Sequence, residues 1–129
     1  MPSPVNVYTV SAPYSQSITG AAETVVALLF GLNVDRIQRR VRFQGLANVT
    51  VGTGGTSVTV TLRRSGVNGQ IVGVAQAETV TAGSTYSIAL DALDEPGEVA
   101  GGTYVMTVTV GAATGNSTVN YAHLGATVY

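Results

Sequence analysis

Side chains that could carry acid–base or nucleophilic chemistry are scarce in this chain. It has no cysteine, and its one histidine is His123. A serine-hydrolase triad needs a histidine base beside a nucleophile, but His123 lies in an alternating segment, and the chain has no nucleophile-elbow motif. A zinc site needs several ligands at short spacing, and none surrounds His123. We therefore expect a solvated or hydrogen-bonded strand histidine, no catalytic residue, no metal site and no cofactor.

Four carboxylates form the one acidic cluster of the sequence, at Asp91, Asp94, Glu95 and Glu98. Oxygen-rich loops can bind calcium, but the EF-hand pattern is absent and Pro96-Gly97 indicates a plain turn. We favour a solvated loop, with a calcium site as the alternative. A glycosidase acid–base pair is disfavoured, because the chain has no tryptophan to supply the usual sugar platform.

The basic residues are segregated from most of the acids. All of them are arginines between residues 36 and 64, whereas most of the acids lie from residue 78 onward, and the net charge is −1. A chain without lysine and with this balance has no broad basic footprint, so we expect no nucleic-acid partner. The arginines either lie on solvated strand faces or contact another subunit; for the second possibility the candidates are Arg39, Arg40 and Arg42.

Strict alternation of apolar and polar residues predicts the elements that hold these side chains. In residues 57–63 the period of two places Val58, Val60 and Leu62 on one strand face. Residues 104–110 repeat the pattern, with Tyr104, Met106, Val108 and Val110 inward. We expect one buried and one wet face in each strand.

The rest of the chain predicts further strands separated by glycine-rich turns. Residues 23–34 form a nearly continuous apolar run that is enriched in β-branched residues, which favours a buried strand over a helix. Asn68-Gly69 predicts a hairpin between 57–64 and 70–80. Residues 37–44 are expected to form a strand, and 46–51 either a further short strand or the far half of one strand bent at Gly45. Residues 91–102 are expected to form a long irregular segment. The other expected strands are 85–90, 103–110 and 118–128. Eight or nine strands predict an all-β fold, an antiparallel two-sheet sandwich of the jelly-roll type.

Residues 1–19 lack helical periodicity and are uncharged, and three of them are prolines. We expect an extended N-terminal arm over 1–19, with a short strand near 5–10, followed by a sandwich domain over 20–129; a disordered terminus is the alternative. The anchors for a partner would be Val5, Val7, Tyr8 and Tyr14. No apolar run reaches the ~20 residues of a membrane span, and we expect neither a secretory signal nor a membrane partner.

Short motifs mark the borders of the expected strands: TGAAETVV at 19–26, RRSG at 63–66, VTAG at 80–83, DEPG at 94–97, GTY at 102–104 and AATGNSTVN at 112–120. In these motifs the chain resembles structural proteins of tailed bacteriophages. The resemblance implies a jelly-roll, tumour-necrosis-factor-like sandwich that forms a homotrimer. It further implies a head decoration (cement) protein, assembled in the host cytoplasm, whose arm reaches over the major capsid protein.

The sequence is compatible with two functions, and neither is enzymatic. The first is a virion protein on the capsid surface that stabilises a phage head by bridging capsid subunits. Its mechanism is contact area repeated by symmetry, without a chemical step. The second is a receptor- or carbohydrate-binding module of a tail fibre.

Overall fold

The computed structural model describes residues 6–12, 15–35 and 40–129, and the described residues form nine strands. The strands are β1 (Asn6–Ala12), β2 (Gln16–Ile18), β3 (Thr24–Val34), β4 (Val41–Thr50), β5 (Ser57–Arg64), β6 (Ile71–Ala77), β7 (Thr85–Asp94), β8 (Val99–Gly111) and β9 (Ser117–Val128). All the pairings between them are antiparallel. Among the described residues, no helix has the length and hydropathy needed to cross a bilayer.

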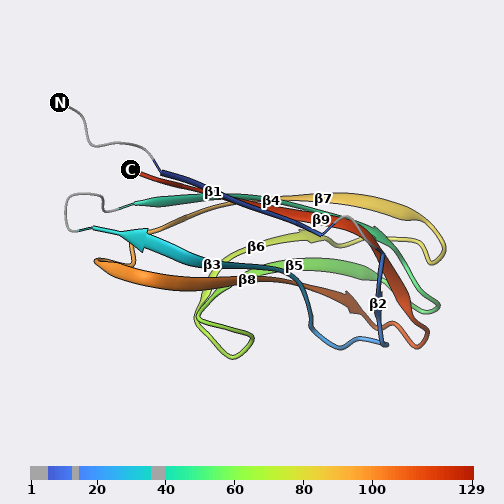
Figure 1. Cartoon of the computed structure of the whole chain (residues 1–129). Coiled ribbons are helices and arrows are strands. Elements are labelled where there is room, and N and C mark those ends of the chain that lie inside the picture. The colour runs from blue at the N-terminus through green and yellow to red at the C-terminus, as the bar shows by residue number, and fades with distance from the viewer. Residues whose placement is uncertain (1–5, 13–14, 36–39) are drawn as a thin grey trace.

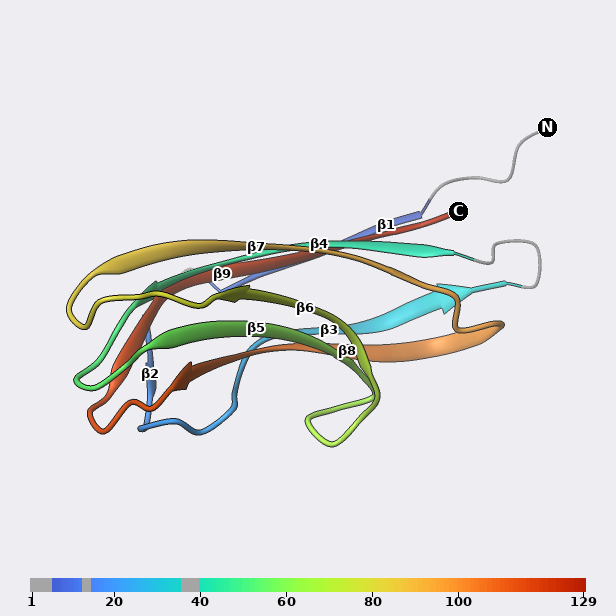
Figure 2. The ribbon, with the colours of Figure 1, turned by 180° about the vertical axis from the view of Figure 1, so that it is seen from behind.

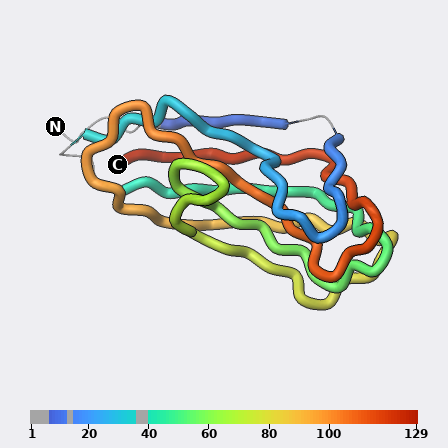
Figure 3. The backbone as a smooth tube through the Cα atoms, turned by 90° about the horizontal axis from the view of Figure 1, so that it is seen from below, coloured from blue at the N-terminus to red at the C-terminus, as the bar shows by residue number. Residues whose placement is uncertain are grey.

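The described strands form two stacked sheets (Figure 1). Sheet A has the order β1-β9-β4-β7, with β2 also pairing with β9, and sheet B has the order β3-β8-β5-β6. Chain-distant strands are therefore neighbours, as in a jelly roll. Seen from below, β1 and β3 lie along one margin of the sandwich, and β6 and β7 along the other (Figure 3). This confirms the all-β, antiparallel jelly-roll sandwich predicted from the sequence.

The core lies between the sheets and is built from the expected alternation. Val58, Val60 and Leu62 of β5 and Met106 of β8 are fully buried. Phe43 of β4 packs on Tyr104 of β8, with ring centroids 4.5 Å apart and planes tilted by 47°. That contact joins the centre of sheet A to the centre of sheet B, in a tilted geometry that aromatic rings favour.

Gly45 neither ends nor kinks its strand, so both alternatives predicted for residues 46–51 were wrong. β4 runs without a break from Val41 to Thr50 and keeps its register with β7 throughout. Gly45 is buried, and a Cβ there would lie 2.7 Å from Sδ of Met106 on the opposite sheet. The glycine makes room for a large side chain across the core, which is another recognised role of glycine in strands.

The segment 91–102 is also more regular than predicted. β7 continues to Asp94 and β8 begins at Val99, so that only residues 95–98 separate them. The period-two pattern of β7 extends through Ala92 and Asp94, both buried. The sequence reading failed because a buried aspartate looks like a loop residue until its partners are known.

The hairpin at 65–69 is confirmed, but its backbone differs from an Asn-Gly turn. β5 and β6 pair from Val58 to Arg63, and Arg64 N–H donates to the Gln70 carbonyl. Positive φ falls on Ser65 (74°) and Gly66 (148°). The loop is longer than the two-residue turn that Asn-Gly favours, and its strained residues sit at its start.

Figure 2 shows that the loops gather at two ends of the sandwich. One end carries residues 51–56, 78–84 and 112–116, which are held to each other by backbone hydrogen bonds such as Val51 N–H to the Ser84 carbonyl and Thr114 N–H to the Thr53 carbonyl. The other end carries residues 65–70 and 95–98 and the C-terminus. Most of the ion pairs of the described residues lie toward this second end.

Asp94 anchors that end as a buried charge shared between the sheets. Its carboxylate accepts two hydrogen bonds from Arg64 (2.6 and 3.1 Å) and one from the Tyr104 hydroxyl (2.6 Å). Burial first, and then the bond to Asp94, raise the pKa of Tyr104 well above its ordinary value, so the hydroxyl stays a donor. Because β7 belongs to sheet A and β5 and β8 to sheet B, this cluster ties the two sheets together.

We expect the substitution Asp94→Ala to lower the free energy of unfolding by ~3 kcal/mol, because it leaves the Arg64 guanidinium without its partly buried partner. Tyr104→Phe removes one hydrogen bond to the carboxylate and should cost ~1 kcal/mol. Urea unfolding followed by circular dichroism measures both effects. The matched control is Asp91→Ala in the same strand, whose side chain is 59% exposed; an equal loss in the control would contradict the role assigned to Asp94.

Candidate interaction surfaces

The outer face of sheet A is a broad surface built by the register of four strands. Every second residue of β4 points away from the core and lies opposite outward residues of β9 and β7. These residues form rows across the sheet, and β1 extends the rows beyond β9. From the end with the C-terminus inward, the rows are Val7–Thr127–Arg42–Leu93, Thr9–Gly125–Gln44–Asp91, Ser11–His123–Leu46–Ala89 and Tyr121–Asn48–Ser87. We call this surface face A.

Face A carries one ion pair and a set of side-chain hydrogen bonds across its strands. The Asn120 amide donates to Oδ1 of Asn48 (2.8 Å) and Oγ1 of Thr50 (3.0 Å). Asn48 in turn donates to Ser87 (2.9 Å), and Thr50 shares a bond with Thr85 (2.8 Å). These bonds fix the polar side chains in place before any partner arrives, which lowers the ordering entropy of a contact.

Sequence reasoning missed this polar ladder. β9 shifts register between the partners of Asn48 and Val49, so that Asn120 is inserted opposite a single step of β4. A bulge of this kind re-aims a side chain. The outward positions of Asn48 and Ser87 could be read from alternation, but the bulge that adds Asn120 could not.

Exposed apolar side chains lie among these polar groups on face A. Val7 is 66% exposed, Leu93 50% and Tyr121 42%. Gly125 has no side chain, and a shallow depression of about 230 Å³ surrounds it, lined by Thr9, Val10, Ser11, Gln44, His123, Leu124 and Gly125. His123 therefore sits, exposed, at the rim of an uncharged hollow.

The predicted arm residues fall at different places. Val5 and Tyr14 lie outside the described residues. Val7 lies on face A in the same row as Arg42. Tyr8, its neighbour in β1, is half-buried on the other side of the strand, and its hydroxyl accepts a hydrogen bond from the Asn33 N–H of β3 (3.3 Å). Most of the described residues of 1–19 belong to β1 and β2 of sheet A, and Ile18 is fully buried.

The arginines predicted to contact other subunits have acidic partners in the same chain where the structure describes them. Arg42 binds Asp91 through two hydrogen bonds (2.8 and 3.2 Å), and Nε of Arg40 lies 3.2 Å from Oε1 of Glu95. The hydrogen bond to Asp91 raises the pKa of Arg42, and its counterpart lowers the pKa of Asp91. Arg39 lies outside the described residues. These exposed pairs still leave Arg40 and Arg42 open to another subunit, and that contact stays a prediction.

The predicted acidic loop is divided by the fold. Asp91 points outward on face A, Asp94 points into the interior, and Glu95 turns toward Arg40. Within the described residues, no group of three or more histidine or acidic side chains is placed to hold a metal ion.

The outer face of sheet B, opposite to face A, is covered more than its sequence predicts. Thr107 is fully buried, and Thr61 and Val105 nearly so, although all three lie on the face expected to be wet. Glu23, just before β3, accepts two bonds from Arg63 (2.8 and 3.0 Å) and one from the Thr107 hydroxyl (2.8 Å). The bond from Arg63 is the main reason that the pKa of Glu23 lies below its ordinary 4.5.

The Glu23–Arg63 pair predicts acid sensitivity. The lowered pKa means that the pair stabilises the folded state above about pH 4.5 and that this stability is lost as the pH falls through the lowered pKa. We expect Glu23→Gln to lower the urea midpoint of unfolding at pH 7. At pH 3 the midpoints of the variant and of the unsubstituted protein should lie closer together. Glu78→Gln, at an exposed loop position, is the control; an equal gap at both pH values would contradict the assignment.

No family model and no curated protein matches the chain. Solved structures do resemble it. The VP2 subviral particle of infectious bursal disease virus aligns with 96% of this chain and 32% of its own, at a TM-score of 0.59 and 16% identity. A structure of the Gx strain of that virus covers 98% of this chain and 32% of its own, at a TM-score of 0.58 and 15% identity. The present chain thus spans about a third of the length of these viral chains.

Another similar structure is nearly equal in length to this chain. The Eiger tumour necrosis factor from S. frugiperda covers 98% of this chain and 94% of its own, at a TM-score of 0.63 and 9% identity. At such low identities the likeness concerns the fold. The chain is therefore similar to viral capsid and tumour-necrosis-factor domains in its jelly-roll sandwich.

Proposed function

We propose that this chain is a non-enzymatic virion protein, a decoration (cement) protein that binds the outer surface of a bacteriophage head. It acts as a homotrimer and stabilises the head by bridging subunits of the major capsid protein. The observation that carries this proposal is face A, a broad surface with preset hydrogen bonds, one neutralised ion pair and exposed Val7, Leu93 and Tyr121.

Face A is suited to docking for physical reasons. Burying an isolated charge is costly, and its one ion pair, Arg42–Asp91, is already neutralised within the chain. The exposed apolar side chains contribute favourable binding free energy when a partner removes their surface from water. Since a repeated contact of ~800 Å² on each partner suffices for specific association, a surface of this kind can hold a shell together without chemistry.

The capsid contact is assigned to Val7 and the subunit contact to Arg40 and Arg42, which lie at the same end of the sandwich. Val7 lies in one row with Arg42, so a shell subunit and a neighbouring copy would meet close together. Tyr8 has its hydroxyl bound to β3, and we assign it the role of holding β1 in place. The viral capsid proteins that share the fold support this choice of assembly.

A charge at the Val7 end of face A should prevent attachment to the head. We expect Val7→Asp to weaken binding at least ~10-fold, because it places an unpaired charge in an apolar contact. The assay is co-sedimentation with heads of the virus that encodes the chain, assembled without it. Val67→Asp, at a valine that is 42% exposed in the β5–β6 loop, is the matched control. Recovery of the chain from tails alone, by mass spectrometry of purified virions, would overturn the proposal.

The tail-fibre alternative has one observation in its favour. Tyr121 is 42% exposed on face A, beside Asn48 and near the hollow around Gly125. Sugar-binding sites combine an aromatic platform with fixed polar groups of this kind.

If this alternative holds, the isolated protein should bind host cells, and Tyr121→Ala should abolish the binding while Tyr129→Ala, at a tyrosine 45% exposed, leaves it intact. Flow cytometry with labelled protein measures the effect. Absence of cell binding by the unsubstituted protein would remove the alternative.

A further inference from the structure

The outer edge of β3 ends sheet B and is free of any strand partner within the described residues. Its two ends are closed by side chains. Nε2 of Gln16 donates to the Val25 carbonyl (2.8 Å), and the Asn33 N–H donates to the Tyr8 hydroxyl (3.3 Å). Residues 26–32 lie between these two bonds, and we call them the open edge.

The open edge lacks the usual protection against strand pairing. β3 has no charged residue and no proline from Thr24 to Val34. Leu28 is 44% exposed and Phe30 is 72% exposed, the highest value among the large apolar side chains that the structure describes. Proteins commonly blunt free edges with lysine, proline or covering loops. An uncharged apolar edge is therefore a site prepared for another strand.

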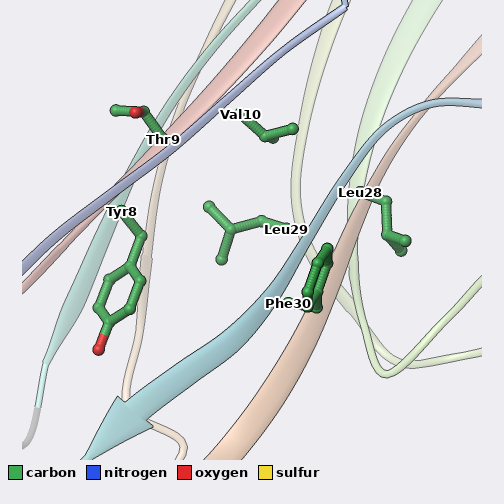
Figure 4. A pocket seen from close by; sticks show the side chains of 6 residues that line it. All are labelled: Tyr8, Thr9, Val10, Leu28, Leu29 and Phe30. Atoms are coloured by element: carbon green, nitrogen blue, oxygen red, sulfur yellow. The ribbon is translucent and has the colours of Figure 1, made fainter.

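A groove runs beside the open edge (Figure 4). Leu29 points from β3 toward β1, whereas Leu28 and Phe30 point away from β1. The groove holds about 190 Å³ and is lined by Tyr8, Thr9, Val10, Leu28, Leu29 and Phe30. No charge lines it, and its size fits an apolar side chain of an added strand.

We propose that the open edge binds the open edge of a second copy of this chain, antiparallel and about a two-fold axis at Leu29. Leu29 is the midpoint between Val25, whose carbonyl is bonded to Gln16, and Asn33, whose N–H is bonded to Tyr8. In this register Phe30 lies opposite Leu28 of the second copy, so each of these exposed side chains is removed from water by the other. Leu29, which is 3% exposed within its own chain, lies opposite its counterpart at the axis.

A second copy fits this edge better than an unrelated strand for two reasons. The edge is uncharged, so antiparallel pairing with itself brings no like charges together. The most exposed side chains, Leu28 and Phe30, are two residues apart, so a two-fold axis at the residue between them places each against the other.

The bulges of β3 keep this contact short and closed. The register with β8 shifts between Val25 and Ala27 and again between Leu29 and Leu32, where Gly31 has φ +75°. The regular register with β8 is thus confined to residues 27–29, and Phe30 lies at the start of the second shift. Because a two-fold contact uses the same patch on both copies, it joins two copies and does not extend into a fibre.

Sedimentation equilibrium of the purified protein tests the pairing without any viral component. We expect Phe30→Asp to halve the number of copies in each particle at micromolar concentration, whether the pairing joins two single chains or two larger assemblies. The matched control, Val74→Asp, changes a 52% exposed valine of β6 on the outer face of sheet B and should leave the mass unchanged. An unaltered mass for Phe30→Asp, or dissociation into thirds, would overturn the two-fold pairing.

Engineered cross-links test the register. The native sequence has no cysteine, so a mixture of the single variants Leu28→Cys and Phe30→Cys should form a disulfide-linked pair under mild oxidation. A mixture of Leu28→Cys with Val74→Cys should not. Failure of the first mixture to cross-link faster than the second would overturn the register. Neither result depends on whether the chain binds heads, since both experiments contain this protein alone.

Discussion

The contact of Phe43 with Tyr104 lies where the two sheets must meet, and the rest of the sandwich is arranged around it. Both rings are fully buried, and they lie on the central strands β4 and β8. The close approach of the two sheets also requires Gly45, because Met106 occupies the space that a side chain at residue 45 would fill. Tyr104 then extends its hydroxyl to Asp94, so one residue serves both the apolar packing and the polar connection between the sheets.

The second constraint is the small number of charges. With six basic and seven acidic side chains, the molecule neutralises most of its arginines internally. Arg63 binds Glu23, Arg64 binds Asp94, and Arg42 binds Asp91. As a result, charges that are separated along the sequence meet across strands in one chain. The surfaces that remain are polar or apolar but mostly neutral, and such surfaces are suited to repeated contact with other proteins.

The fold was largely predictable, because strand faces follow from a local period of two. The inward residues of 57–64 and 104–110 are those that the alternation predicts, although Thr61, Val105 and Thr107 on the outward face are buried as well. The hairpin near Asn68-Gly69 was found by its turn residues. The errors arose at residues whose role depends on contacts with residues that are distant in the sequence. Gly45 looked like a kink because Met106 could not be seen opposite it, and Asp94 looked like a loop residue because its partners Arg64 and Tyr104 are 30 and 10 residues away.

The candidate surface was predicted less well than the fold. Val7 and Arg42 were both named from the sequence, but for separate roles, and only the pairing of β1 and β4 with β9 placed them in one row. By itself, the sequence determined the all-β class, the inward faces and the scarcity of catalytic side chains, because these depend on composition and on neighbours along the chain. The tertiary structure decided which charges pair, which face carries the polar ladder and which edge stays open. Those features depend on strands that are distant in the sequence, and chain order alone does not specify how such strands come together.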